Sequence, residues 1–348
     1  MNGHGRRAAA LSAILLFGGA SRAATPGGLV VEVTPARQSL AGNENVVVTV
    51  TIRNTSRTWQ YVPKWQTPFA GVEAPLFDVT RDGLPVSYLG IQVKRAPPTS
   101  ADLVALAPGA ARSSRVELSA LYRMDITGAY TIRYRTDRLQ GATTSPSASV
   151  WIDGRLPRGL PEASYAPRAA AAPAGSGLTF NHCSNAQQES IAASVQAAQS
   201  MAQDGEAYLR AGALADRYTS WFGPLDEARA ATVSRHFVAI HDAFATRPIK
   251  VDCACTQSWY AYVYPDQPYT IHVCKAFWTA PMTGTDSKGG TLVHEMSHFT
   301  VVAGTDDWAY GQVAAGALAG SNPDRAIDNA DSHEYFGENT PYRNLRRR

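Results

Sequence analysis

The chain has 348 residues, which is long for one domain and sufficient for two that each bury a core. Apolar residues make up 45% and charged residues 18%, as in an ordinary globular protein. The formal net charge of +3 is too small to indicate a nucleic-acid-binding protein, so that class is excluded.

Residues 1–23 have the pattern of a secretory signal peptide. Two arginines precede an apolar run over residues 8–17, and small residues lead to a cleavage site after about Ala23. The run is too short to cross a bilayer, and no later stretch approaches the roughly 20 apolar residues of a membrane helix. We expect a secreted protein, extracellular or periplasmic, with no membrane anchor after cleavage; the alternative is an uncleaved anchor. The sequence leaves the oligomeric state open.

Residues 24–152 carry the patterns of β-strands. Residues 46–53 and 130–135 alternate between two faces, which is typical of half-buried strands. Asp82 and Gly83 lie between two strand-like runs, as in a hairpin turn. Several short strands separated by turns predict an all-β domain, a sandwich of immunoglobulin-like type. No cluster of side chains in this domain indicates catalysis.

Residues 153–178 differ in character, because prolines are set among Gly, Ala and Ser. Proline removes backbone donors and small side chains bury little, so this stretch is predicted to be a linker and a processing site.

Residues 179–348 begin with helical spacing. Ser184 is the expected N-cap of a helix with Ile191, Val195, Ala198 and Ala202 on one face. A second helix carries an apolar stripe from residue 233 to residue 244. Short strands are expected over 261–264 and 269–274, followed by helices to the end.

The four cysteines all lie in this second half, at Cys183, Cys253, Cys255 and Cys274. Export favours two disulfides. Three pairings are possible, and because a Cys-x-Cys pair does not easily close on itself, Cys253 and Cys255 should each reach a distant partner. A zinc site of four cysteines is the alternative.

The stretch from Thr291 to His298 contains His-Glu-x-x-His within a predicted helix. Residues four apart lie on one helical face, so His294 and His298 can both offer an imidazole nitrogen to one metal ion. Glu295 can reach a reacting water as general base without taking a coordination position. A catalytic zinc also needs a third protein ligand and an open position.

The third ligand is expected just beyond this helix. A metzincin would have Gly at position 301 and His at position 304, but this chain has Val301 and Gly304, so it is not a metzincin. Gly304 can end the helix and turn the chain back toward the metal, which brings Asp306 or Asp307 close. The alternative is that the two aspartates only cap a helix.

The sequence from Thr179 to the C-terminus resembles the aspzincin metallopeptidases, which include the deuterolysins and the fungal peptidyl-Lys metalloendopeptidases. Their signature is His-Glu-x-x-His followed by Gly-Thr-x-Asp-x-x-Tyr-Gly, and residues 294–298 and 304–311 match every specified position. The resemblance implies a mainly α (α+β) zincin-type domain with one zinc per chain. It implies that Asp307, not Asp306, is the third ligand and that Tyr310 assists at the transition state. His333 is the second candidate for the third ligand.

The resemblance also implies disulfides joining Cys183 to Cys253 and Cys255 to Cys274. In the related enzymes the mature protein starts near Thr179, so residues 24–152 are expected to be a pro-domain removed by cleavage in the linker. The predicted protein is therefore a zymogen of a zinc endopeptidase that acts on protein or peptide substrates.

Residues 329–335 resemble the segment that lines the lysine pocket of the peptidyl-Lys enzymes, with Asp331 and Glu334 at the acidic positions. A spacing of three places both carboxylates on one helical face, where they suit a compact ammonium with three donors. Cleavage on the amino side of lysine is therefore predicted. The alternatives are a solvated acidic face, a deuterolysin-like enzyme of broader specificity, and a secreted binding or adhesive protein with an inert zincin fold. The intact Glu295 argues against the last.

Overall fold

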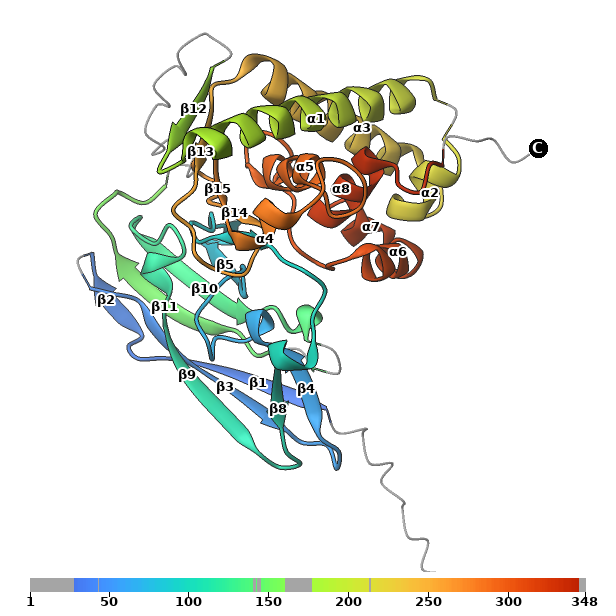
Figure 1. The fold of residues 1–348 in the computed structure, drawn as a ribbon. Helices are drawn as coiled ribbons and strands as arrows, with labels where there is room; N and C mark the ends of the chain where they lie inside the picture. Colours follow the sequence, from blue (N-terminus) through green and yellow to red (C-terminus); the bar gives the residue numbers. More distant parts are fainter. Residues whose placement is uncertain are drawn as a thin grey trace, which may run out of the picture.

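The computed structural model describes residues 28–42, 44–139, 142, 145–159, 177–212 and 214–343. The predicted signal peptide and most of the predicted linker lie outside these residues. Figure 1 shows an all-β part and a part in which helices cover a sheet. Within the described residues, no helix combines the length and apolarity needed to cross a membrane.

The all-β part contains two main sheets that share one core. The first has the order β1-β3-β9 and is antiparallel, and the second has the order β2-β11-β10-β5-β6. A separate pair joins β4 to β8. The strands are β1 (Leu29–Pro35), β2 (Ser39–Ala41), β3 (Val47–Asn54), β4 (Gln60–Pro63), β5 (Phe77–Arg81), β6 (Leu84–Pro85), β8 (Leu103–Leu106), β9 (Ala111–Glu117), β10 (Gly128–Tyr134) and β11 (Ala148–Asp153). Short 3-10 helices cover Lys64–Gln66, Ser100–Asp102, Leu118–Ala120 and Thr136–Arg138.

The period-2 patterns identify the buried faces of these strands. Val48, Val50 and Ile52 of β3 are fully buried, as are Tyr130 and Ile132 of β10. The predicted turn between β5 and β6 is formed by Asp82 and Gly83, both with positive φ (50° and 84°), as a tight hairpin requires.

The second part has a sheet in the order β12-β13-β15-β14-β7 and eight described helices. Its strands are β12 (Leu178–Asn181), β13 (Ile249–Asp252), β14 (Ala261–Val263) and β15 (Thr270–Val273). Its helices are α1 (Asn185–Arg210), α2 (Asp216–Phe222), α3 (Glu227–Thr246), α4 (Lys275–Thr279), α5 (Lys288–His298), α6 (Gln312–Ser321), α7 (Pro323–Ala326) and α8 (Ala330–Glu338). In Figure 1 the long helices α1 and α3 extend across one side, with α5 and α8 beneath them.

Local sequence explains where the central helices begin. Ser184 caps α1 in a reciprocal capping box with Gln187, and Ser287 accepts a hydrogen bond from the Gly290 N–H at the start of α5. Every residue of α5 is buried, which is expected of a helix surrounded by other elements. Its side chains therefore have fixed surroundings.

The fifth strand of this sheet, β7 (Gln92–Lys94), comes from the all-β part of the chain. It pairs antiparallel with β14, so that Lys94 lies opposite Ala261 and Val93 opposite Tyr262. No pattern in the sequence indicated that residues 24–152 contribute a strand to this second sheet.

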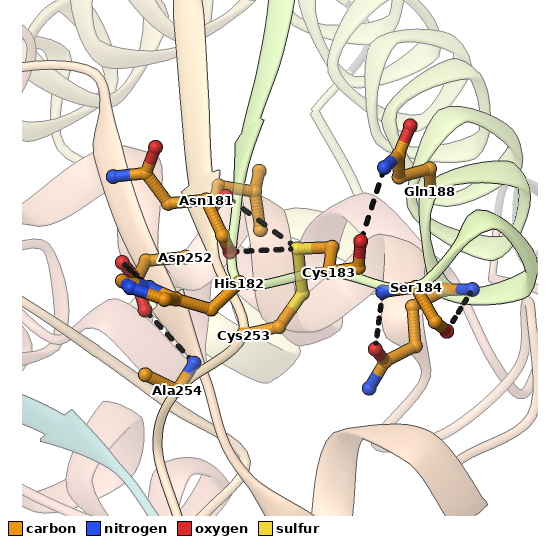
Figure 2. Close-up of a disulfide and its surroundings, with 10 residues drawn as sticks. Asn181, His182, Cys183, Ser184, Gln188, Asp252, Cys253 and Ala254 are labelled. Atoms are coloured by element: carbon orange, nitrogen blue, oxygen red, sulfur yellow. Dashed lines mark hydrogen bonds and ion pairs between the residues drawn. A yellow bond between two sulfur atoms is a disulfide. The ribbon is translucent and has the colours of Figure 1, made fainter.

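The disulfides join Cys183 to Cys253 and Cys255 to Cys274, the pairing that the resemblance implies. Figure 2 shows the first, which connects the residue before the α1 N-cap to the end of β13. It spans 70 residues of chain, a loop whose closure removes on the order of 4 kcal/mol of unfolded-state entropy. A four-cysteine zinc site is thereby excluded.

Candidate active site

Three potential metal ligands converge where α5 meets the loop that follows it. His294 Nε2 and His298 Nε2 lie 3.1 Å apart, and Asp307 Oδ1 lies 3.2 Å from the first and 3.4 Å from the second. All three side chains are buried. Gly304, at φ 62°, lies in the turn that brings Asp307 back to the helix.

These distances fit a zinc ion. Tetrahedral zinc with ligand bonds of about 2.0–2.2 Å holds neighbouring ligand atoms about 3.3–3.6 Å apart. Two imidazole nitrogens and one carboxylate oxygen form a donor set that catalytic zinc uses, and three protein ligands leave a position open.

The remaining nitrogen of each histidine lies close to an oxygen atom. Asp331 Oδ1 lies 2.9 Å from His294 Nδ1, and the Thr305 carbonyl oxygen lies 2.8 Å from His298 Nδ1. Such partners select the tautomer that presents Nε2 to a metal. Asp306 turns away and forms an ion pair with Arg135 of the all-β part at 2.7 Å.

Glu295 is fully buried beside the three ligands. Its Oε1 accepts a hydrogen bond from the Lys94 N–H at 3.3 Å, and its Oε2 has no hydrogen-bond partner among the described residues. Burial raises the pKa of Glu295 to about 7. That value is suited to a group that takes up and returns a proton near neutral pH.

Tyr310 points into the same site. Its hydroxyl donates to the Val93 carbonyl oxygen at 2.9 Å, and its ring packs edge-on against Trp65. Burial, followed by the charge of Asp307, holds the pKa of Tyr310 well above its usual range, so the phenol stays a hydrogen-bond donor.

An acidic pocket formed by Asp286, Asp331 and Glu334 adjoins the ligands and contains the side chain of Lys94. The Lys94 ammonium lies 2.7 Å from Glu334 Oε2, 3.0 Å from Asp331 Oδ1 and 3.2 Å from Asp286 Oδ1. Lys94, Asp331 and Glu334 are fully buried, and the rings of Tyr260 and Tyr335 lie 5.7 and 5.3 Å from the ammonium. The ammonium thus donates hydrogen bonds to Asp331 and Asp286 and forms an ion pair with Glu334.

The charges in this pocket are mutually stabilising. Burial alone would lower the pKa of Lys94, but Asp331 and Glu334 outweigh it and hold that pKa well above its usual value. At Asp331 burial would raise the pKa, but Lys94, His294 and the Gly311 N–H together outweigh it and lower the pKa, whereas burial raises the pKa of Glu334. Asp331 is therefore the firmer negative charge.

Sequence reasoning missed three residues of this site: Val93, Lys94 and Asp286. Asp286 immediately precedes the α5 N-cap at φ 50°, outside the motif. The scarcity of lysine was the one sequence feature that could have drawn attention to Lys94, because only Lys64 and Lys94 occur before residue 250.

His333, the second choice for third ligand, does not face the metal ligands. Its Nδ1 lies 2.9 Å from the Asn329 carbonyl oxygen and its Nε2 lies 3.0 Å from His236 Nδ1, so both nitrogens are occupied. Packing between α3 and α8 explains this pair, and His333 is withdrawn as a candidate ligand.

The His236–His333 pair predicts acid sensitivity. Burial lowers the pKa of His236 to about 4 and that of His333 to about 3, against 6.5 for an ordinary histidine. The unfolded chain therefore binds more protons below pH 6.5, and the free energy of unfolding should fall by roughly 3–6 kcal/mol between pH 6.5 and 4. Urea unfolding of a Glu295→Gln chain, which avoids self-digestion, measures it. His236→Asn with His333→Asn should flatten the profile; the same slope in both proteins would contradict the assignment.

The fold and this arrangement are those of a zinc peptidase, and comparison with known proteins identifies the family. The family described as lysine-specific metallo-endopeptidase, the aspzincins, matches residues 207–338. An extracellular protease from Aeromonas hydrophila is 42% identical over 95% of this chain and 98% of its own length. A peptidyl-Lys metalloendopeptidase from Grifola frondosa is 36% identical over 87% and 91%, and one from Pleurotus ostreatus 48% over 47% and 98%.

The chain therefore belongs to the aspzincin family of zinc metallopeptidases, as the motif predicted. It is a metalloendopeptidase with a zinc cofactor, its catalytic part has the zincin-type fold of strands and helices, and its substrates are proteins or peptides.

Proposed function

We propose that this protein is a secreted zinc endopeptidase that hydrolyses peptide bonds on the amino side of lysine. One observation carries the proposal: a lysine side chain is fully buried among three carboxylates beside the His-Glu-x-x-His helix. The predicted secretion agrees with the relative from A. hydrophila, which is named an extracellular protease.

In this proposal His294, His298 and Asp307 hold one zinc per chain. The metal, when bound, supplies a Lewis acid that polarises a water molecule and the substrate carbonyl. Glu295 takes a proton from the attacking water and returns it to the leaving amine. Tyr310 donates a hydrogen bond to the carbonyl oxygen as negative charge develops there.

Lysine selectivity follows from the shape and charge of the pocket. Asp286, Asp331 and Glu334 present three oxygens within 3.2 Å of one nitrogen. A compact ammonium lies within ion-pair distance of all three, whereas a planar guanidinium directs its donors in a fixed fork. An uncharged side chain would leave buried carboxylates without a counter-ion, which costs several kcal/mol.

The domain organisation is part of the proposal. Residues 1–23 form a signal peptide, 24–152 an immunoglobulin-like pro-domain, 153–178 a linker with a processing site, and 179–348 the catalytic domain. The pairing of the two main sheets around one core supports a sandwich. The relative from P. ostreatus is close in length to residues 179–348, which supports an active form without the pro-domain.

A deuterolysin-like enzyme of broader specificity remains the closest competitor, and an inert binding protein is the more distant one. The acidic pocket argues against the first, and the buried Glu295 with an unsatisfied oxygen argues against the second. A broader endopeptidase would cut a protein substrate without regard to lysine, and an inert binding protein would produce no fragments.

The active secreted form should contain one zinc per chain and should lose at least about 10²-fold of its activity in a chelator, with recovery on adding zinc. The test is digestion of a denatured protein, with and without chelator, followed by sequencing of the fragments. New N-termini should be lysine. Cuts placed without regard to lysine would refute the specificity, and activity that survives zinc removal would refute the metal assignment.

A further inference from the structure

Strand β7 lies beside the candidate metal ligands and Glu295 as an extended peptide substrate would. It adds to the edge of β14 in antiparallel register, and the Tyr260 N–H donates to the Lys94 carbonyl oxygen at 3.0 Å. Strand addition of this kind supplies main-chain hydrogen bonds for affinity and leaves side-chain pockets to determine specificity. The acidic pocket lies next to β7, and the side chain of Lys94 fills it.

The peptide bond between Val93 and Lys94 lies among the proposed catalytic groups. Its carbonyl oxygen accepts the Tyr310 hydroxyl hydrogen bond at 2.9 Å, and its nitrogen lies 3.3 Å from Glu295 Oε1. The Val93 carbonyl oxygen therefore lies where the developing oxyanion would accept a hydrogen bond from Tyr310. The Lys94 nitrogen lies where the leaving amine would receive a proton from Glu295. Lys94, the residue after this bond, is the residue type that the pocket selects.

Contacts on both sides of the bond fix its position. Upstream, the Val93 N–H donates to Asp307 Oδ2 at 3.3 Å and the Gln92 amide donates to the Thr305 carbonyl oxygen at 3.1 Å. Downstream, Arg95 stacks over the Trp65 ring and pairs with Glu73 at 3.0 Å. A bond held in this way by its own chain reacts as an intramolecular substrate with high effective concentration.

The distribution of lysine in the sequence gives an independent reason to single out this bond. Before residue 179 the chain has only Lys64 and Lys94, and the linker over 153–178 contains no lysine. A lysine-specific enzyme therefore cannot cut its own linker, and Lys64, which is exposed, is its only other choice in the pro-region.

We propose that the enzyme cleaves its own Val93–Lys94 bond, so that the full-length chain is a complex of the catalytic site with an internal substrate. This proposal rests on the proposed lysine specificity. The water oxygen bonds to the Val93 carbonyl carbon and the C–N bond breaks. Glu295 passes the proton taken from water to the Lys94 nitrogen, which leaves a carboxyl group on Val93 and a free amine on Lys94. Cleavage of the linker requires a different protease.

The test uses the full-length chain, purified in chelator and started with Zn²⁺, with fragments followed by intact mass and N-terminal sequencing. A fragment that begins at Lys94 should form with the same half-time at protein concentrations about 100-fold apart, because the substrate is in the same molecule. Glu295→Gln should slow it at least about 10³-fold. An uncut bond, or a half-time that shortens in proportion to concentration, overturns the proposal.

Variants of Lys94 test whether recognition by the acidic pocket, and not exposure of the bond, determines cleavage at Val93–Lys94. Lys94→Gln should slow the cut at least about 10²-fold, and Lys94→Arg, which keeps the charge needed for folding, at least about tenfold. The matched control Lys64→Gln should leave the half-time unchanged. Equal rates in all three variants would overturn the assignment of Lys94.

An external lysine peptide, added to the same samples, tests the proposed function separately. Hydrolysis of that peptide by a chain whose Val93–Lys94 bond stays intact overturns self-cleavage but leaves the proposed function standing. A full-length chain that cuts neither bond overturns self-cleavage; because an uncut β7 would fill the site, the proposed function is then decided by peptide hydrolysis in the active form without the pro-domain.

Discussion

Replacing Glu295 by Gln should leave one zinc per chain and reduce peptidase activity by about 10³-fold or more. Gln has nearly the same size and shape, so the buried position should stay filled, but an amide cannot take a proton from water or return it to the amine. General acid–base catalysis of this kind contributes about 10²–10⁴-fold. Glu295 lies beside the three proposed ligands without belonging to the converging set of donor atoms, so metal content should not change.

The measurement is hydrolysis of a lysine peptide by the active secreted form, together with metal analysis of the same sample. Glu189→Gln, an exposed position on α1, is the matched control and should keep full activity. Loss of zinc from the Glu295 variant would mean that this residue holds the metal, and the assignment of roles in the motif would have to change.

Much of the catalytic part was predictable because its information is local. The spacing of His294 and His298 requires only that residues 288–298 form a helix, and Ser287 begins it. The turn at Gly304 places Asp307 within the following nine residues. Strand periodicity identified the buried faces of β3 and β10 in the same way, since each pattern is complete within one element.

The contribution of the pro-region was not predictable from such patterns. Lys94 and Glu295 are 201 residues apart, and the pairing of β7 with β14 depends on how two distant parts of the chain meet. Three residues of strand carry no periodicity that distinguishes them from any other short run. The sequence could not show that His333 has another partner, because the contact of its Nε2 with His236 Nδ1 depends on the packing of α3 against α8.

The second large effect is expected on kcat/KM when the carboxylates of the acidic pocket are replaced. Asp331→Asn with Glu334→Gln should lower kcat/KM for a lysine peptide by about 10²–10³-fold, because removing the partners of a buried charge costs about 2–5 kcal/mol. A peptide with norleucine in place of lysine, which has the same chain without the charge, should lose little or even gain. The ratio of the two kcat/KM values therefore reports charge recognition, separately from any general damage to the site.

That ratio matters because Asp331 also lies 2.9 Å from His294 Nδ1 and so helps to orient a proposed ligand. A purely orienting role would lower activity on both peptides equally and would reduce zinc content. Asp286→Asn provides the cleaner probe, since the side chain contacts the ammonium and the Tyr335 hydroxyl. Its side chain is 28% exposed, so solvent screens the charge and the lysine preference should fall by only about tenfold. If Asp286→Asn and the double variant both keep the full ratio of lysine to norleucine hydrolysis, the three carboxylates do not select lysine.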